Sequence, residues 1–291
     1  MTGTFVVVTE LLKIAVPNKG SLAEDAAAML RAAGYRQRWD LKDLVWTDSA
    51  NGIEFYYLRP RDIAVYVGEG TLDLGITGRD MLLDSAANAR EVLQLGFGET
   101  HFRFARPAGA AIDMDSLDGL RIATSYPGLV RRYLDAQGVS ARLIGLDGAV
   151  ESAIRLGVAD IIADVVETGS TLKRAGLEVF GPVLLDSEAI LVQREGAEAP
   201  AGMDLLLRRL SGVIVARDYV LVDFDVPDEA LPATAALAPG LEGPTVSPLA
   251  KPGWSAVRTL VPRKGHQALM DALWEAGARA ILVTEVSTAR L

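Results

Sequence analysis

The segment from Asp164 to Thr171 brings two carboxylates, a glycine and three hydroxyl groups together within one short stretch of chain. It follows the β-branched run 157–166, which predicts a buried strand of a parallel sheet, and it leads into a short helix that Gly176 ends. Backbone N–H groups and hydroxyls at such a turn can donate to a phosphate, and the Asp164 and Glu167 carboxylates can accept from sugar hydroxyls. The segment therefore indicates a sugar phosphate site.

The binding free energy that such a turn can supply limits this interpretation. A helix terminus stabilises a surface anion by about 0.3 to 1 kcal/mol, and by up to about 2 kcal/mol when it is partly buried. Micromolar binding requires roughly 8 kcal/mol, so other groups must contribute. The chain has no G-x-x-x-x-G-K-[ST] motif to supply a phosphate-binding lysine. A plain turn capped by Thr168 or Ser170 would use the same residues, and local chemistry leaves both interpretations open.

Three further groups of residues are candidates for binding an anion. Lys19 lies in the turn Pro17-Asn-Lys-Gly20, between a predicted strand and a predicted helix. The segment Leu58-Arg-Pro-Arg-Asp62 is a compact charged cluster, and Gly75-Ile-Thr-Gly-Arg-Asp80 ends a strand in a glycine turn followed by Arg79. Ordinary surface charge and a plain connection between a strand and a helix are the alternatives for these groups.

Composition excludes several functional classes. The chain has 291 residues, a net charge of -9 and no cysteine. The charge argues against nonspecific binding to nucleic acid or to an anionic membrane, since both favour a basic face. Because His101 and His266 are its only histidines and fall in different predicted domains, a catalytic triad or a histidine metal site is not expected. Any metal should be a hard ion such as Mg²⁺, held mainly by phosphates of the substrate.

The N-terminal stretch 1–10 is apolar but lacks the features of an export signal. It has no basic region before its apolar core, it carries Glu10 just after that core, and it shows no cleavage pattern of small residues. No run approaches the ~20 apolar residues of a spanning helix. We expect a soluble cytoplasmic protein with a short N-terminal extension.

Strand and helix signals alternate from Leu12 to about Gln193, which predicts an α/β region with a largely parallel sheet. Two strand-turn-helix halves indicate two lobes, and the run Ile63–Val67 is predicted to be a strand. The run 181–193 is predicted to be one strand that returns to the first lobe. The expected division is therefore lobe I at 12–100 and 183–197, and lobe II at 101–182.

A different order of elements follows the predicted helix 203–210. Strands are expected at 219–226, 245–249, 256–261 and 280–286, with helices at 228–237 and 265–276. The order β-α-β-β-α-β is that of the ferredoxin-like arrangement. The sequence therefore predicts a separate C-terminal domain over 211–291.

Taken together, several ordered motifs closely resemble the long form of ATP phosphoribosyltransferase, and the resemblance runs from about Leu12 to Leu291. The motifs are PNKG, GTLDLGITGRD, DGAVESAIRLGVADIIADVVETGSTL, SEAILVQR and PGLEGPTVSPL. The resemblance implies that N1 of ATP attacks C1 of phosphoribosyl pyrophosphate in the presence of Mg²⁺. Pyrophosphate leaves, and the product is phosphoribosyl-ATP, in the first step of histidine biosynthesis. It also implies two catalytic lobes resembling periplasmic binding proteins, followed by a ferredoxin-like regulatory domain.

The resemblance also assigns roles to residues. It implies a catalytic role for Asp164, Glu167 and Lys19. It implies that the substrates are bound by Thr168, Gly169, Ser170, Thr171, Gly20, Arg59, Gly78, Arg79 and Asp80. Inhibitory L-histidine would contact Asp225, Leu241, Thr245 and Ala280.

The same resemblance implies a homo-oligomer, built from dimers into a hexamer, while the net charge argues against a nucleic acid or membrane partner. Two other functional classes remain as alternatives. A two-lobed solute-binding protein would share the architecture, but it would require export. A purely regulatory amino-acid sensor would retain the C-terminal domain without catalysis, and the intact DVVETGST segment argues against it.

Overall fold

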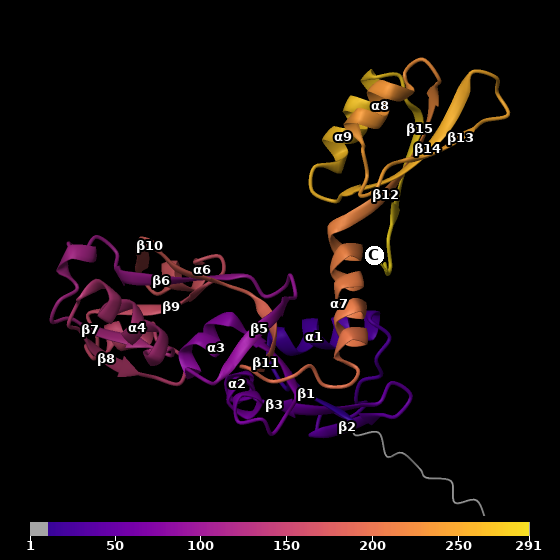
Figure 1. Ribbon diagram of the computed structural model, residues 1–291. Coiled ribbons are helices and arrows are strands. Elements are labelled where there is room, and N and C mark those ends of the chain that lie inside the picture. The colour runs from indigo at the N-terminus through magenta and orange to yellow at the C-terminus, as the bar shows by residue number, and fades with distance from the viewer. Residues whose placement is uncertain (1–10, 291) are drawn as a thin grey trace, which may run out of the picture. The chain divides into compact units, whose positions relative to one another are not determined.

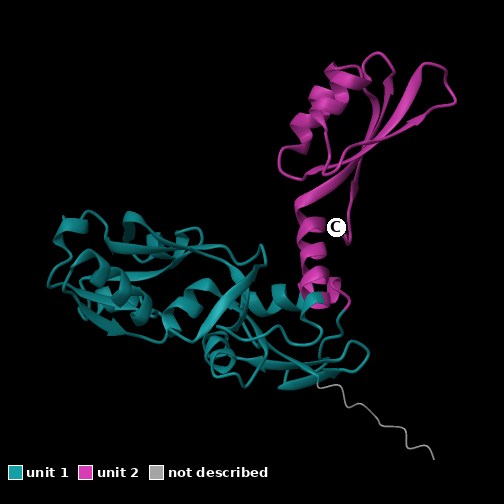
Figure 2. Ribbon diagram, viewed as in Figure 1, with its two compact units in different colours: residues 1–28, 35–204 teal, residues 29–34, 205–291 magenta. Residues whose placement is uncertain are grey.

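The computed structural model describes residues 11–290, so the stretch expected as an N-terminal extension lies almost wholly outside the described residues. The chain divides into two compact units (Figure 2). Unit 1 comprises residues 1–28 and 35–204, and unit 2 comprises residues 29–34 and 205–291. Unit 1 holds two of the three sheets, and unit 2 holds the third.

The first sheet, which defines lobe I, has six strands in the order β2-β3-β1-β4-β11-β5 (Figure 1). The strands are β1 (Leu12–Pro17), β2 (Val45–Asp48), β3 (Ile53–Leu58), β4 (Leu74–Gly78), β5 (Ala89–Gln94) and β11 (Ala189–Arg194). The helices along this part of the chain are α1 (Ser21–Ala32), α2 (Pro60–Gly68) and α3 (Arg79–Ser85). β1 runs parallel to β3 and β4, whereas β11 runs antiparallel to β4.

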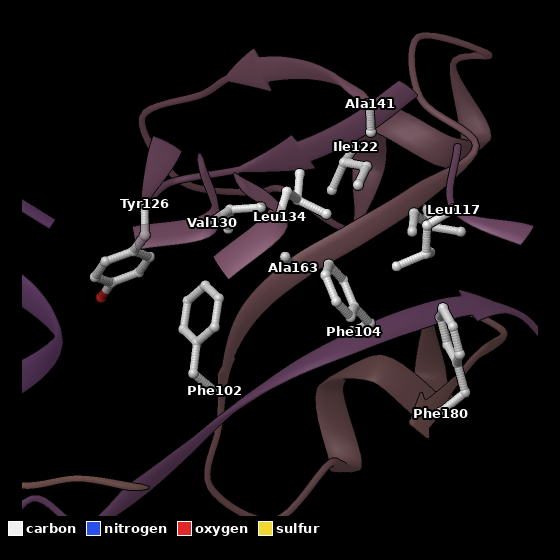
Figure 3. Packing of buried hydrophobic residues seen from close by; sticks show 11 residues of the cluster. Phe102, Phe104, Leu117, Ile122, Tyr126, Val130, Leu134, Ala141, Ala163 and Phe180 are labelled. Carbon is white, nitrogen blue, oxygen red and sulfur yellow. The ribbon is translucent and has the colours of Figure 1, made fainter. Parts of the chain in front are cut away.

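The second sheet, which defines lobe II, has five strands in the order β10-β6-β9-β7-β8. The strands are β6 (Thr100–Pro107), β7 (Arg121–Thr124), β8 (Arg142–Gly145), β9 (Ile161–Val166) and β10 (Leu177–Ser187). The helices are α4 (Pro127–Gln137), α5 (Ser152–Arg155) and α6 (Ser170–Arg174), with a 3-10 turn at Met114–Ser116. Aromatic side chains fill the core beside β6, where Phe102, Phe104 and Phe180 are buried (Figure 3).

Two segments cross between the lobes and are hydrogen-bonded to each other. The first follows β5 at residues 95–99, and the second is Glu188, between β10 and β11. The Gly96 N–H donates to Glu188 Oε2 at 3.1 Å. Beside it, the Leu95 N–H donates to the carbonyl of Ala189, the first residue of β11, and the Ala189 N–H donates to the Phe97 carbonyl. Lobe II is therefore one continuous stretch of chain between two parts of lobe I.

The single strand predicted over 181–193 is wrong, because two strands in different sheets occupy this stretch. β10 continues to pair with β6 as far as Ser187, after a register shift between Phe180 and Leu185. β11 then begins at Ala189 in the sheet of lobe I. The expected start of the returning segment at residue 183 thus falls inside β10, where the apolar run gave no sign of a change of sheet.

The strand predicted at Ile63–Val67 is also wrong, since these residues lie in α2. Pro60 occupies the first turn of that helix, a position that needs no N–H donor. The buried residues Ile63, Ala64 and Val67 have the i, i+1, i+4 spacing of one helical face. The β-branched composition suggested a strand, but tertiary packing of this face determined a helix.

Unit 2 contains the predicted β-α-β-β-α-β domain. After α7 (Met203–Asp218), the elements are β12 (Tyr219–Pro227), α8 (Leu231–Leu237), β13 (Thr245–Pro248), β14 (Trp254–Pro262), α9 (His266–Glu275) and β15 (Arg279–Glu285). The strand order is β13-β14-β12-β15, and all neighbours are antiparallel. α7 extends beyond the predicted end at residue 210, so the expected domain boundary at 211 lies within this helix.

The expected fold class is confirmed as α/β: a region of two lobes, each with its own sheet, precedes a four-stranded ferredoxin-like domain. Alternation along β12 explains how the C-terminal core forms. Val220, Val222, Phe224 and Val226 are buried, and the residues between them lie on the other face of the sheet. Buried side chains from β14, α9 and the α8 region complete this core.

Candidate functional site

A cavity of about 600 Å³ lies in unit 1 between the two lobes. Gly78, Asp80 and residues from the start of α1 line it from lobe I, and Tyr126 and Glu167 line it from lobe II. The crossing segment 95–99 contributes Phe97, Gly98 and Glu99, and Ser187 lines the cavity from the end of β10. Two segments widely separated in sequence, the GITGRD turn and the DVVETGST loop, thus reach the same cavity.

Asp80 is the most enclosed acid in this wall, with only 5% of its surface exposed. Its backbone N–H donates to Ser187 Oγ at 3.0 Å, and the Ser187 hydroxyl donates to Asp80 Oδ1 at 2.9 Å. Burial raises the pKa of Tyr126 well above its usual range, and the negative charge of the nearby Asp80 acts in the same direction. A Cβ on Gly78 would lie 2.2 Å from Asp80 Oδ1, so glycine is needed there to leave room. Asp80 of lobe I is therefore hydrogen-bonded to the end of β10 in lobe II.

Asp164 lies on β9 and pairs in register with Arg103 of β6. Burial raises the pKa of Asp164 to about 6, and the charges of Glu151 and Asp80 act in the same direction. The Val165 N–H, which donates to Asp164 Oδ1 at 2.9 Å, opposes this rise, as does the charge of Arg61. The carboxylate is thus less readily ionised than an exposed aspartate.

The loop after β9 exposes the predicted phosphate-binding groups. Gly169 has a φ of 70°, in the left-handed region that glycine adopts readily. The Thr168 hydroxyl donates to Ser170 Oγ at 3.1 Å. Glu167, Thr168, Ser170 and Thr171 are all exposed, and Glu167 reaches the cavity wall. The loop therefore presents its hydroxyls and one carboxylate to solvent on the lobe II side.

The charged side chains that line the cavity are all acidic. Its carboxylates are those of Asp25, Asp80, Glu99 and Glu167, and the same lining includes no lysine or arginine. Among the described residues, no group of three or more histidine, aspartate or glutamate side chains is arranged to hold a metal ion. A polyanion entering this wall must therefore bring its own countercharge or meet cations from outside the lining.

The predicted cations lie outside the cavity lining. Lys19 and Gly20 are exposed in the turn before α1, adjacent to Ser21 of the cavity wall. Arg59 is exposed just before α2. The structure thus places these three residues at the surface of lobe I.

Arg79 has a different position from the one expected for a substrate ligand. Its guanidinium pairs with Glu91 at 2.9 Å and with Glu188 at 3.1 Å, and it also donates to the Asp186 carbonyl. Glu91 and Glu188 raise the pKa of Arg79, so its charge is firmly held. This geometry favours a role in holding the returning crossing segment against lobe I.

Sequence reasoning missed Asp25, Tyr126 and Ser187 as cavity residues. One signal was present for Tyr126: the turn Ser125-Tyr-Pro-Gly128 follows β7 as Pro17-Asn-Lys-Gly20 follows β1. Nothing local marked Ser187, because it lies inside the run that was predicted to be one strand. Asp25 is an exposed residue of α1, and nothing in the local sequence marked it as facing a cavity.

The predicted inhibitor residues lie on two parts of the unit 2 sheet. Asp225 of β12 pairs with Arg279, next to Ala280, at a register shift between β12 and β15. Ala280 has a φ of 50°, an uncommon conformation for a residue with a side chain. Leu241 and Thr245 are exposed before and at the start of the edge strand β13. The structure therefore brings Asp225 and Ala280 together, and places the other two toward the opposite edge of the sheet.

No helix among the described residues has the length and apolar character needed to cross a membrane.

Known proteins resemble this chain over nearly its whole length. A family model described as ATP phosphoribosyltransferase matches residues 59–212, and one described as HisG, C-terminal domain, matches residues 216–288. An ATP phosphoribosyltransferase of Arthrobacter sp. (strain FB24) is 57% identical over 97% of this chain and 100% of its own length. One from Salinispora tropica is 59% identical with the same coverage.

A solved structure is also similar to this chain. The ATP phosphoribosyl transferase (HisG:HisZ) complex from Thermotoga maritima matches with a TM-score of 0.60 and 27% identity. The match covers 69% of this chain and 97% of that one. With both lobes, the C-terminal domain and these relatives in agreement, the chain belongs to the ATP phosphoribosyltransferase family, in its long form with a C-terminal domain.

Proposed function

We propose that the interlobe cavity is where this enzyme transfers the phosphoribosyl group of phosphoribosyl pyrophosphate to N1 of ATP. The reaction yields phosphoribosyl-ATP and pyrophosphate, and it is the first step of histidine biosynthesis. One observation carries the location: Asp80 of lobe I and Glu167 of the lobe II loop line the same cavity. The alternatives of a solute-binding protein and a non-catalytic sensor are not favoured, given a relative 57% identical over its full length.

The proposed reaction requires little proton transfer by the protein. N1 of adenine already has a lone pair, so it forms the new bond to C1 without a general base. The bond from C1 to the pyrophosphate oxygen breaks, and pyrophosphate leaves with the bonding electrons. C1 develops oxocarbenium character, as in glycoside cleavage, so nearby carboxylates stabilise it. Asp164 on β9 and Glu167 in the loop that follows are proposed to play this role and to accept hydrogen bonds from the ribose hydroxyls.

The DVVETGST loop is proposed to hold the 5′-phosphate. Support comes from the exposed hydroxyls of Thr168, Ser170 and Thr171, and from the left-handed Gly169 that turns the chain between them. Because Thr168 and Ser170 are hydrogen-bonded to each other, their two hydroxyls lie within reach of one common acceptor. A phosphate oxygen would replace that mutual bond with charge-assisted bonds, which are roughly twice as strong.

On the lobe I side, Lys19, Gly20 and Arg59 are proposed to bind the phosphates of the nucleotide or the leaving pyrophosphate. Gly78 and Asp80 would contact substrate from the cavity wall. Arg79 is proposed to act indirectly, since its guanidinium already binds two carboxylates.

Mg²⁺ is proposed to arrive with the substrates. The described residues do not form a protein-held metal cage, yet four carboxylates line the cavity. Two polyphosphates would be repelled by that wall unless their charge were neutralised. Mg²⁺ bound mainly by substrate phosphates would supply the neutralisation, and it would favour departure of pyrophosphate.

We further propose feedback inhibition by L-histidine at unit 2, a homo-oligomer of dimers up to a hexamer, and a cytoplasmic location. Asp225 supports the first point, because its carboxylate suits a cationic group and it lies beside Ala280. The relative from Thermotoga maritima was solved as a complex of two proteins, which supports association within the family.

The proposed reaction is tested by incubating the enzyme with ATP, phosphoribosyl pyrophosphate and Mg²⁺ and following pyrophosphate release. Glu167→Ala should lower kcat/KM for phosphoribosyl pyrophosphate at least tenfold, equivalent to about 1.4 kcal/mol. Asp135→Ala, an exposed acid on α4 in the same lobe, serves as the control. Absence of release by the unaltered enzyme would refute the function. Equal effects of the two substitutions would remove Glu167 from the site.

A further inference from the structure

The first turn of α4 is capped by a residue from the other lobe. The N-cap residue of this helix, Tyr126, makes no capping bond with its side chain. The Leu129 N–H in that turn donates instead to Asp84 Oδ1 at 3.0 Å, although Asp84 lies near the end of α3 in lobe I. A carboxylate here satisfies an otherwise unpaired donor and interacts favourably with the helix dipole. The start of α4 is thus bonded directly to lobe I.

The same carboxylate also holds a cation against Tyr126. Asp84 Oδ2 accepts from Arg61 Nη1 at 3.1 Å, and the Asp84 side chain is only 12% exposed. Arg61 Cζ lies 4.5 Å from the centre of the Tyr126 ring, within the range of a cation–π contact. Arg61 and Asp84, both from lobe I, therefore contact two consecutive parts of lobe II.

The two helices approach as closely as their backbones allow at this point. A Cβ on Gly128 would lie 2.2 Å from the Asp84 carbonyl oxygen. Because this position is glycine, the α4 backbone can lie directly against α3. The contact is therefore an interface of backbone and charged groups rather than a water-filled gap.

Tyr126 connects this contact to the cavity. Its ring packs edge-on against Phe102, with ring centroids 5.3 Å apart and an interplanar angle of 80°. Figure 3 shows its hydroxyl directed away from the apolar cluster of lobe II, and the charge of the cavity residue Asp80 acts on this hydroxyl. Phe102 and Arg61 thus hold the ring of a residue that itself lines the cavity.

We propose that Arg61 and Asp84 form an interlobe clamp that holds Tyr126 in the cavity wall, which makes Arg61 a positioning residue for the transfer reaction. The proposal rests on the function proposed above for this cavity. Arg61 is not in the cavity lining, so it acts through Tyr126 and through the distance between α3 and α4. Without the guanidinium, one face of the ring loses its partner, and Asp84 keeps only its bond to α4.

The clamp is tested in the full-length enzyme with two independent measurements. The first is amide hydrogen exchange at Leu129, which reports the bond to Asp84 whether or not the enzyme turns over. The second is pyrophosphate release. The test variants are Arg61→Gln, Asp84→Ala and their combination, and Arg132→Gln, an exposed arginine on α4, is the control.

We expect Asp84→Ala and Arg61→Gln each to accelerate Leu129 exchange and to lower kcat/KM at least tenfold. The double variant should lose little more kcat/KM than the more affected single variant, because the two residues act as one unit. Arg61→Lys keeps the positive charge, but a lysine side chain cannot lie flat on the Tyr126 ring. This variant should therefore restore slow exchange at Leu129 more fully than it restores kcat/KM.

Two results would overturn the clamp. Unchanged exchange at Leu129 in Arg61→Gln would show that Arg61 does not support the contact. Faster exchange with full turnover would show a structural contact without a positioning role. If the unaltered enzyme released no pyrophosphate, the proposed function would fail, and the exchange measurement would still decide whether the clamp exists.

Discussion

At the scale of single residues, the site uses carboxylates whose properties depend on their surroundings. Asp164 on β9 and Asp80 on α3 are both enclosed, but Asp80 accepts a hydrogen bond from the Ser187 hydroxyl whereas Asp164 accepts one from the N–H of its neighbour Val165. Burial therefore raises the pKa of Asp164 to about 6. This shift ties the stability of the protein to pH.

Asp164→Asn should change how stability varies with pH. The raised pKa means that protonated Asp164 favours the folded state below about pH 4, and that this contribution is lost as pH rises through about 6. A shift of about two units corresponds to roughly 3 kcal/mol. The unfolding free energy of the asparagine variant, relative to the unaltered enzyme, should therefore increase between about pH 4 and pH 7. Chemical denaturation at several pH values checks this, and parallel curves for the two proteins would contradict it.

At the scale of elements, the loop between β9 and α6 depends on one backbone conformation. Gly169 has a φ of 70°, and a Cβ there would meet only Val166 Cγ1, at 3.8 Å. An alanine would fit sterically, but it would be strained by about 1 to 2 kcal/mol in the left-handed region. The loop geometry, rather than packing, is what this glycine maintains.

Gly169→Ala should therefore weaken use of phosphoribosyl pyrophosphate at least tenfold and destabilise the fold by about 1 kcal/mol. Gly138→Ala is a matched control, because Gly138 has a φ of 69° at the end of α4 and a Cβ there would meet no atom within 4 Å. The control should lose similar stability and keep its steady-state kinetics. Equal kinetic losses in both variants would argue against the phosphate loop.

The sequence was sufficient for elements whose pattern is local. The strand predicted at 219–226 is β12, and a turn was predicted where the loop after β9 lies. Contacts between distant segments were not predictable: Asp84 and Leu129 are 45 residues apart, and Arg79 and Glu188 are 109 apart. Their bonds depend on how the lobes meet. Arg79 was predicted to bind substrate because its ion pair with Glu188 was not foreseen. Glu188 lies in the stretch 181–193, which was predicted to be a single strand.

At the scale of the whole molecule, the proposed reaction site and the proposed regulatory site belong to different units. Unit 1 contains the cavity, and unit 2 contains the four residues proposed to contact histidine. Regulation by a second site requires that histidine bind the enzyme's states with different affinity. A substitution in unit 2 should therefore alter inhibition without altering the uninhibited reaction.

Asp225→Ala should raise the histidine concentration needed for half inhibition at least tenfold, while kcat and KM stay within twofold. The reason is that Asp225 supplies a carboxylate for a cationic group and lies far along the chain from the catalytic loop. Asp271→Ala, an exposed acid on α9, is the control and should leave inhibition unchanged. Inhibition at the same histidine concentration in Asp225→Ala would refute the assigned contact.

The path of the chain between the lobes has a consequence for how the protein is made. β5 pairs with β11, which also lies beside β4, so the sheet of lobe I is finished only after all of lobe II has been synthesised. Lobe II is continuous from Thr100 to Ser187, these end residues are paired, and it has its own buried clusters. Since domains fold as units as they leave the ribosome, the middle of the chain can reach its native form first. Lobe I cannot complete its sheet until β11 has been translated, after all of lobe II. Until then, the edges of β4 and β5 that pair with β11 have no partner strand.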